Sequence, residues 1–227
     1  PGVVILMEDR TLAVQETKVM AGAGVFMRSL ASFALRHSLR GVEELAGIPG
    51  TVGGAIRGNA GTWSTEIKDV LQRVEFLDTQ HANGGVQALT AAECNFAHRE
   101  SIFKHRPNWI ILRGTFQLVS GDPVEGEKLV QQDIKLRRER QPYDAPSSGS
   151  IFKNPPGKFA GALLEQAGMK GLTVGGAEIS SLHANWILNR GRATSQDIRQ
   201  LIEQAQVSVL KTSGVQLEPE VVLVNPH

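Results

Sequence analysis

A glycine-rich run over residues 47–61 is the first candidate for chemistry in this chain. Glycine lets the backbone turn through positive φ or approach a ligand closely, and amides freed in this way can bind an anion. Such a loop suits a pyrophosphate, with Thr51 as an added hydroxyl donor. The spacing fits neither G-x-x-x-x-G-K-[ST] nor G-x-G-x-x-G, which disfavours an ATPase or Rossmann unit. The alternative is a tightly packed structural turn, which glycine content alone leaves equally open.

The second candidate is the segment 147–155, Ser-Ser-Gly-Ser-Ile-Phe-Lys-Asn-Pro, which places hydroxyl, ammonium and amide groups close together. A neutral serine is a weak acid, so it can protonate only a strongly basic carbon that is held in contact with it. Ser147, Ser148 and Ser150 compete for such a role on chemistry alone. The alternative is a turn or cap hydroxyl, which is the commoner role for serine between loop residues.

Composition limits the other functions. The chain has 227 residues, 41% hydrophobic and 21% charged, with a net charge of +1, so no global field recruits nucleic acid or a membrane. The one cysteine, Cys94, excludes an internal disulfide, and the histidines show no zinc spacing, so no metal site is expected. No apolar run approaches a membrane span and no signal peptide is visible. The chain starts at Pro1 in an apolar run, which we expect to be the middle of a longer protein.

The elements that must position these groups can be read from apolar patterns. Strands are predicted at 2–7, 11–21, 70–78, 109–119 and 215–224. Helices are predicted at about 26–38, 124–140, 159–167 and 195–212, with Thr194 as the cap of the last and Gly214 as its end. Thr90-Ala91-Ala92-Glu93 has capping-box spacing and should start a short helical turn. Residues 141–146 are the best candidate boundary between two parts.

These segments together resemble one family, that of UDP-N-acetylenolpyruvoylglucosamine reductase, a flavoenzyme of bacterial peptidoglycan synthesis. The resemblance follows the family's order along nearly the whole chain. It rests on these residues: 21–24, 47–61, 65–70, 96–103, 141–142, 147–155, 160–168, 175–177, 183–185 and 217–221. The short segment after Phe103 resembles the shorter type of the family, which lacks a loop carrying a substrate-closing tyrosine. One departure is His98, because the family usually has tyrosine before its arginine.

The resemblance implies an α+β fold of two parts. Residues 1–140 would be the second lobe of a two-lobed, vanillyl-alcohol-oxidase-like FAD-binding domain. Residues 141–214 would be an α+β substrate domain. The last segment, 215–227, would return to the FAD-binding lobe and carry Glu220 with it.

The resemblance also implies FAD and NADPH as cofactors and assigns site residues. Arg99 would bind the substrate carboxylate, Ser150 would donate the proton, and Glu220 would face the same carboxylate as Arg99, with Glu218 as its rival. Without the motif, Arg99 would be interpreted as part of a structural ion pair. Lys153 and Asn154 would bind the substrate, while His183 is more often a structural residue. FAD would be held by these residues: Gly47, Ile48, Pro49, Gly50, Thr51, Gly53, Gly54, Asn59 and Ala60.

The implied function is NADPH-dependent reduction of UDP-N-acetylglucosamine enolpyruvate to UDP-N-acetylmuramate in the cytoplasm, for cell wall biogenesis, cell shape, cell cycle and cell division. The alternatives are a non-catalytic flavin- or sugar-nucleotide-binding relative, or a truncated inactive fragment. The family's flavin site also uses a glycine-rich loop in an earlier subdomain, which does not occur in this sequence. We therefore expect that a missing N-terminal flavin subdomain is required for tight FAD binding and turnover.

Overall fold

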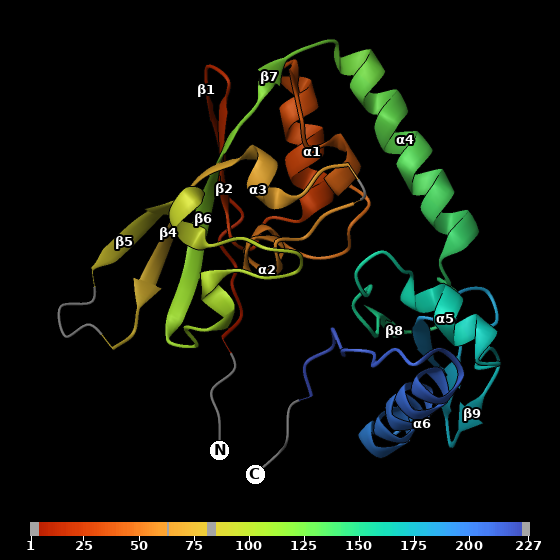
Figure 1. Cartoon of the computed structure of the whole chain (residues 1–227). Coiled ribbons are helices and arrows are strands. Elements are labelled where there is room, and N and C mark those ends of the chain that lie inside the picture. The colour runs from red at the N-terminus through yellow and green to blue at the C-terminus, as the bar shows by residue number, and fades with distance from the viewer. Residues whose placement is uncertain (1–4, 63, 81–84, 224–227) are drawn as a thin grey trace. The chain divides into compact units, whose positions relative to one another are not determined.

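The computed structural model describes residues 5–62, 64–80 and 85–223. Its contacts divide the chain into two compact units, with the division between Lys135 and Leu136. Figure 1 labels the helices and strands along the chain. We call residues 2–135 the first unit and residues 136–227 the second unit.

The first unit is built on a five-stranded antiparallel sheet in the order β1-β2-β6-β4-β5. The strands are β1 (Leu12–Gln15), β2 (Lys18–Gly22), β4 (Leu71–Asp78), β5 (Val86–Thr90) and β6 (Trp109–Gln117). A separate pair joins β3 (Leu39–Arg40) to β7 (Val119–Ser120). Alternating side chains of β2, β4 and β6, including Val19, Phe76 and Phe116, are buried in one apolar core.

Helices α1 (Met27–Arg36) and α2 (Val52–Gly58) contribute to the same core through Leu30 and Ile56. The short α3 (Ile67–Val70) begins at a capping box made by Glu66 and Asp69. Three 3-10 turns, Glu43–Leu45, Ala92–Cys94 and Ile102–Lys104, complete the unit. Cys94 is fully buried, and burial raises the pKa of its thiol to about 11, which keeps it protonated.

Helix α4 (Pro123–Arg140) starts in the first unit and ends in the second. The second unit has a four-stranded antiparallel sheet in the order β8-β11-β10-β9. Its strands are β8 (Ser147–Ser150), β9 (Thr173–Val174), β10 (Ala177–Ile179) and β11 (Trp186–Asn189). The second unit has an apolar core of its own. Helices α5 (Ala160–Gln166) and α6 (Ser195–Ser213) pack in this core with Ile151, Ile187 and Leu217.

Most predicted elements are present. The helices predicted at 26–38, 124–140, 159–167 and 195–212 are α1, α4, α5 and α6. Thr194 caps α6 by accepting from the Asp197 amide, and Gly214 ends it at φ 69°. The predicted strand 11–21 is a hairpin instead, because Glu16 takes a positive φ of 52° between β1 and β2. Of the strand predicted at 2–7, residues 5–7 have no regular structure, and residues 2–4 lie outside the described residues.

The predicted return of residues 215–227 to the first unit needs correction. Residues 215–223 belong to the second unit, where Leu217 is buried in the core beside Ile151. They form no strand of their own; one isolated antiparallel bridge joins Pro219 to Phe152. The physical reason is that Leu217 finds its apolar partners next to the 150–153 segment. Residues 224–227 lie outside the described residues.

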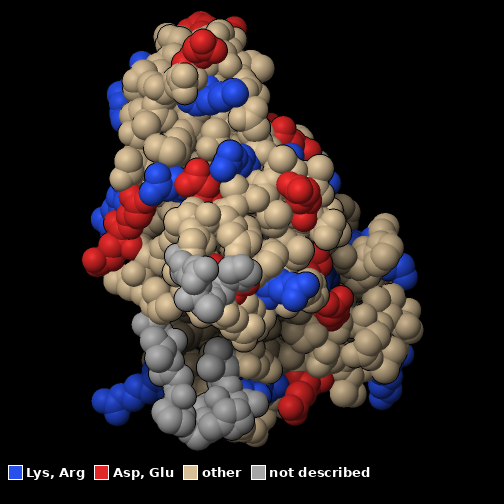
Figure 2. Space-filling view, turned by 90° about the vertical axis from the view of Figure 1, so that its left-hand side faces the viewer, with Lys and Arg blue, Asp and Glu red and all other residues tan. Residues whose placement is uncertain are grey.

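Charges are mixed on the face drawn in Figure 2, where lysine and arginine side chains are interspersed with acidic ones. None of the helices in the described part of the chain is long and apolar enough to cross a membrane.

Candidate functional site

The glycine-rich run folds partly into a helix. Gly50 has φ 131° and precedes Thr51, which is the N-cap residue of α2. The Val52 and Gly53 amides donate to the carbonyls of Val25 and Ala23, at 2.8 and 3.0 Å. The start of α2 is therefore fixed against the residues that follow β2.

The glycines of this run fall into two kinds. At Gly53, an added Cβ would lie 3.0 Å from the Ala23 Cβ and 3.3 Å from its carbonyl oxygen, so close packing against Ala23 favours glycine. At Gly54, the nearest atom would be the Thr51 hydroxyl at 3.8 Å, and at Gly50 nothing lies within 4 Å. Glycine inside a helix is unfavourable, and packing does not explain Gly54. The backbone at Gly50 and Gly54 is thus open on the side that a Cβ would occupy, which fits the approach of a pyrophosphate.

Arg99 lies at a two-residue turn beside the end of this run. Ala97 and Glu100 exchange backbone hydrogen bonds of 3.1 and 3.0 Å across the turn, and Arg99 takes a positive φ of 57°. The half-buried guanidinium donates from Nη2 to the Gly61 carbonyl at 3.0 Å. The turn that carries Arg99 therefore lies against Gly61, 38 residues earlier in the chain, and Gly61 in turn pairs with Glu66.

Ser150 and Glu220 come together in the second unit. Ser150 ends β8, where it pairs with Trp186 of β11, and Gly149 before it has φ 81°. The Glu220 amide donates to the Ile151 carbonyl at 2.7 Å, so Glu220 lies one residue along from Ser150 across this pairing. Among the described residues, no partner is recorded for the Ser150 hydroxyl, whereas Ser147 accepts from the Gly149 amide at 3.5 Å. This distinguishes Ser150 from a capping serine.

The buried Asn185 holds this arrangement. Its side chain accepts from the Phe152 amide at 2.9 Å and donates to the Phe152 carbonyl at 2.8 Å. Its backbone carbonyl accepts from the Ile151 amide at 2.9 Å. The family motif 183–185 pointed to this residue, but residue type alone did not indicate that it clamps the 150–153 segment.

The other predicted residues have mixed surroundings. Lys153 forms an ion pair of 2.6 Å with Glu218, whose side chain is 70% exposed. The Asn154 oxygen accepts from the Ala160 amide at the start of α5, at 3.0 Å. Burial lowers the pKa of His183, and its Nδ1 accepts from the Asn185 amide at 3.2 Å, which is a structural role.

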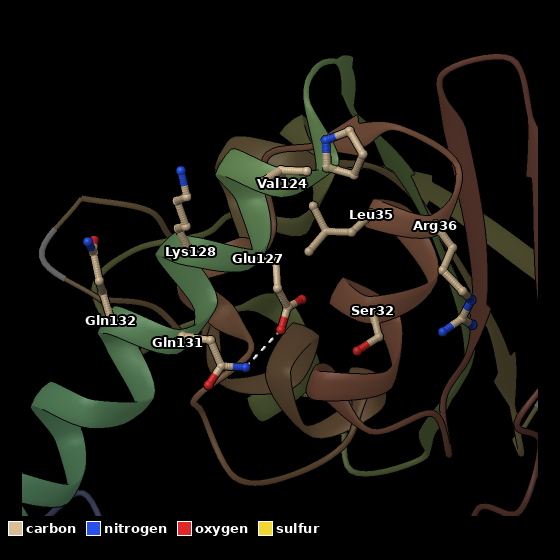
Figure 3. A pocket seen from close by; sticks show the side chains of 9 residues that line it. Ser32, Leu35, Arg36, Val124, Glu127, Lys128, Gln131 and Gln132 are labelled. Carbon is tan, nitrogen blue, oxygen red and sulfur yellow. Dashed lines mark hydrogen bonds between the residues drawn. The ribbon is translucent and has the colours of Figure 1, made fainter.

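A hollow of about 770 Å³ lies between α1 and α4 in the first unit (Figure 3). Residues such as Leu35, Arg36, Val124 and Lys128 line it, and Glu127 and Gln131 hydrogen-bond at its edge, at 2.8 Å. None of the predicted site residues is among its lining residues, so its size does not identify it as the active site.

Comparison with known proteins defines first a class and then a family. Residues 1–89 match the model of an FAD binding domain. Residues 141–224 match the model described as UDP-N-acetylenolpyruvoylglucosamine reductase, C-terminal domain. The chain has an α+β fold similar to the crystal structure of UDP-N-acetylenolpyruvylglucosamine reductase from Thermus caldophilus, with a TM-score of 0.76 and 34% identity over 91% of this chain and 73% of that one.

Two curated relatives carry the same name. The protein of Caldanaerobacter subterraneus subsp. tengcongensis is 43% identical, and the match covers 98% of this chain and 73% of that protein. The protein of Anoxybacillus flavithermus is 37% identical over 98% of this chain and 74% of that protein. The chain therefore belongs to the UDP-N-acetylenolpyruvoylglucosamine reductase family. The resemblance stated from the motifs is confirmed.

Proposed function

We propose that this chain is an NADPH-dependent flavoenzyme that reduces UDP-N-acetylglucosamine enolpyruvate to UDP-N-acetylmuramate, a step of peptidoglycan synthesis in the cytoplasm. The observation that carries the proposal is family membership over 98% of the chain, which includes every segment named above. Through that reaction the protein would contribute to cell wall biogenesis, cell shape, the cell cycle and cell division. The requirement for a flavin subdomain preceding Pro1 stays a prediction.

The glycine run supports a site for FAD. When bound, FAD supplies the hydride chemistry. Because the Val52 and Gly53 amides are already bonded to Val25 and Ala23, we assign pyrophosphate contacts to the open backbone of Gly50 and Gly54 and to the neighbouring Thr51. Gly47, Ile48, Pro49 and Ala60 would shape the rest of the loop. The Asn59 side chain is bonded inside the protein, to Glu66, Ala97 and Lys68.

Arg99 and Glu220 are assigned to the substrate's carboxylate. Negative charge builds on the enolpyruvyl group during its reduction, and a planar guanidinium matches a carboxylate with two parallel hydrogen bonds. A preorganised cation at the developing charge is electrostatic catalysis. The Gly61 carbonyl, which accepts one Arg99 nitrogen, limits the directions in which the remaining donors can point.

Ser150 is assigned as the donor of the proton to the substrate carbon. Ser150 is half-buried and ends a strand, and Asn185 and Glu220 hold the residues that follow it, Ile151 and Phe152, by hydrogen bonds. Lys153 and Asn154 are assigned to the diphosphate and sugar. The exposed partner of Lys153, Glu218, is easily given up, because an exposed ion pair contributes only about 0–1 kcal/mol.

The change Ser150→Ala tests the proposal. In the FAD-loaded protein, reduction of the flavin by NADPH should stay nearly intact. Reoxidation by the enolpyruvyl sugar should slow by about 10²–10⁴-fold, the usual contribution of general acid catalysis. Stopped-flow absorbance of both half-reactions measures this, with Ser148→Ala as the matched control. Equal losses in both halves would assign Ser150 to folding, and a wild-type protein that the sugar never reoxidises would be a non-catalytic relative.

A further inference from the structure

The Asn59 side chain connects three separate segments of the first unit. Asn59 is fully buried and ends α2 in the left-handed conformation, at φ 43°. Its Nδ2 donates to the Ala97 carbonyl at 2.9 Å and to the Glu66 carboxylate at 3.0 Å. Its Oδ1 accepts from the Lys68 amide at 3.1 Å. Both donors and the acceptor of the amide are thus used inside the protein.

The contact to Ala97 holds one end of the turn that carries Arg99. Ala97 and Glu100 close this turn by their mutual backbone bonds, and Arg99 occupies it at a φ that is unfavourable for a residue with a side chain. Such a conformation persists only where the surroundings over-determine it. Asn59 on one side and the Lys104 ammonium, 2.5 Å from the Arg99 carbonyl, on the other supply that constraint.

The guanidinium end is held by the same cluster. Gly61, two residues after Asn59, accepts the Arg99 Nη2 and pairs with Glu66 in an isolated bridge. A Cβ on Gly61 would lie 2.6 Å from the Glu66 Cγ, so this close approach requires glycine. The Asn59–Glu66 pair therefore helps to hold Arg99 in two ways: Asn59 bonds the turn that carries its backbone, and Glu66 pairs with the Gly61 that accepts from its guanidinium.

We propose that Asn59 is a positioning residue for Arg99, with Glu66 as its partner, and that its side chain is not a flavin ligand. This replaces the sequence-based assignment of the Asn59 side chain to FAD. The inference rests on the proposed role of Arg99 at the substrate carboxylate. It identifies Asn59 as a residue that acts on the substrate half-reaction through another side chain.

The charges around Glu66 suit this role. Burial opposes its ionisation, but the Lys68 ammonium at 2.8 Å, the Asn59 amide and the nearby His98 outweigh burial and lower the pKa of Glu66. His98 Nδ1 lies 3.7 Å from the carboxylate, and Asp69 faces the Glu66 backbone amide at 2.7 Å. Glu66 therefore remains an ionised acceptor for Asn59.

The test uses Asn59→Gly in the FAD-loaded protein. Glycine keeps the left-handed helix end and removes only the amide. The matched control is Asn95→Gly, because Asn95 also has a left-handed backbone, at φ 49°, but is exposed and has no recorded side-chain partner among the described residues. Both variants are compared with wild type by FAD titration and by the two half-reactions.

Reoxidation of the flavin by the enolpyruvyl sugar should slow about 10–100-fold in Asn59→Gly, because small misplacements of a binding group cost up to about that factor. FAD affinity and reduction by NADPH should change less than about threefold, as should every step in Asn95→Gly. Loss of FAD affinity together with equal losses in both half-reactions would overturn the proposal and return Asn59 to the flavin loop. Wild-type rates throughout would overturn it as well.

A second variant gives a signature that a merely structural role would not produce. Asn59→Asp keeps the shape and the acceptor but loses the donors, and its carboxylate faces that of Glu66. Like-charge proximity and burial raise the pKa of the introduced carboxyl, and its protonated form regains one donor. The ratio of its reoxidation rate to the wild-type rate should therefore rise as the pH falls from about 8 to about 6. A ratio independent of pH, at a reduced rate, would count against the hydrogen bond to Ala97 or Glu66.

A third measurement does not depend on activity. Hydrogen exchange of the Ala97 and Glu100 amides should be at least about tenfold faster in Asn59→Gly, while amides of the β4–β6 ladder exchange at unchanged rates. If exchange at the turn is unchanged, positioning by Asn59 is wrong whatever the enzyme does. If exchange rises but the wild-type protein shows no reaction with the sugar, the positioning stands and the proposed function fails.

Discussion

Glu218 and Glu220 show how neighbours separate two residues of one type. Glu218 is exposed and paired with Lys153, and its carbonyl accepts from the Lys153 amide. Glu220 is half-buried, and its amide is fixed to Ile151, next to Ser150. The strand interpretation of 215–224 left the two glutamates as rivals, and their surroundings favour Glu220.

A matched pair of substitutions tests this at the residue scale. Glu220→Gln should slow reoxidation by the enolpyruvyl sugar by about 10-fold or more, because a charged hydrogen bond to the reacting group contributes about 1.5–3 kcal/mol. Reduction by NADPH should be nearly unchanged. Glu218→Gln removes an exposed ion pair and should change either half-reaction little. Stopped-flow measurement of both variants decides, and the reverse pattern would make Glu218 the functional acid.

At the scale of elements, helix α2 fixes the backbone of the glycine run that we propose as the FAD site. Its first amides are bonded to Val25 and Ala23, and its Ile56 is buried against Gly114 of β6, where a Cβ would lie 2.8 Å from Ile56 Cδ1. Tertiary contacts therefore form this helix against the poor helix propensity of its glycines.

Adjacent glycines of α2 should respond oppositely to alanine. Gly53→Ala forces a methyl group against Ala23 and should destabilise the protein by about 1–3 kcal/mol. Gly54→Ala meets no close atom and should stabilise the FAD-free protein by about 0.5–1 kcal/mol, through helix propensity. Gly54→Ala should nevertheless weaken FAD binding, because its methyl group covers the open backbone. Urea unfolding without FAD and titration with FAD measure the two effects; unchanged FAD affinity in Gly54→Ala would move the pyrophosphate elsewhere.

At the scale of the whole molecule, the chain consists of two units with separate apolar cores. The proposed FAD contacts of the glycine run all fall in the first unit. Of the residues proposed for the sugar nucleotide, Ser150, Lys153, Asn154 and Glu220 fall in the second unit, and Arg99 falls in the first.

Peptide-resolved hydrogen exchange tests this division. Saturating FAD stabilises what binds it by RT ln(1 + [L]/Kd), about 2.7 kcal/mol at 100 times Kd. FAD should therefore protect peptides covering 47–61 most strongly. Addition of UDP-N-acetylglucosamine enolpyruvate to the FAD-loaded protein should give its largest added protection at 147–154 and 218–220. The opposite distribution would reverse the ligand assignment of the two units.

The sequence alone determined the family, because its motifs are local and specific, and it determined the elements with strong local signals. Helix α6 has its Thr194 cap, its apolar spacing and Gly214, and β4 and β6 are rich in apolar residues. Helix α2 and strand β8 were not predicted, because glycine and serine have low propensity for either structure and only partners distant in sequence stabilise them.

Only the tertiary structure decided how the site residues are held. The inward direction of the Asn59 amide, the clamp of Asn185 on Phe152 and the place of 215–223 in the second unit all depend on contacts between segments far apart in sequence. Residue type gives the hydrogen-bonding capacity of an asparagine, but burial and the neighbouring carbonyls decide which groups it bonds. The motifs thus selected the candidate residues, and packing decided which of their side chains are bonded inside the protein, as those of Asn59 and Asn185 are.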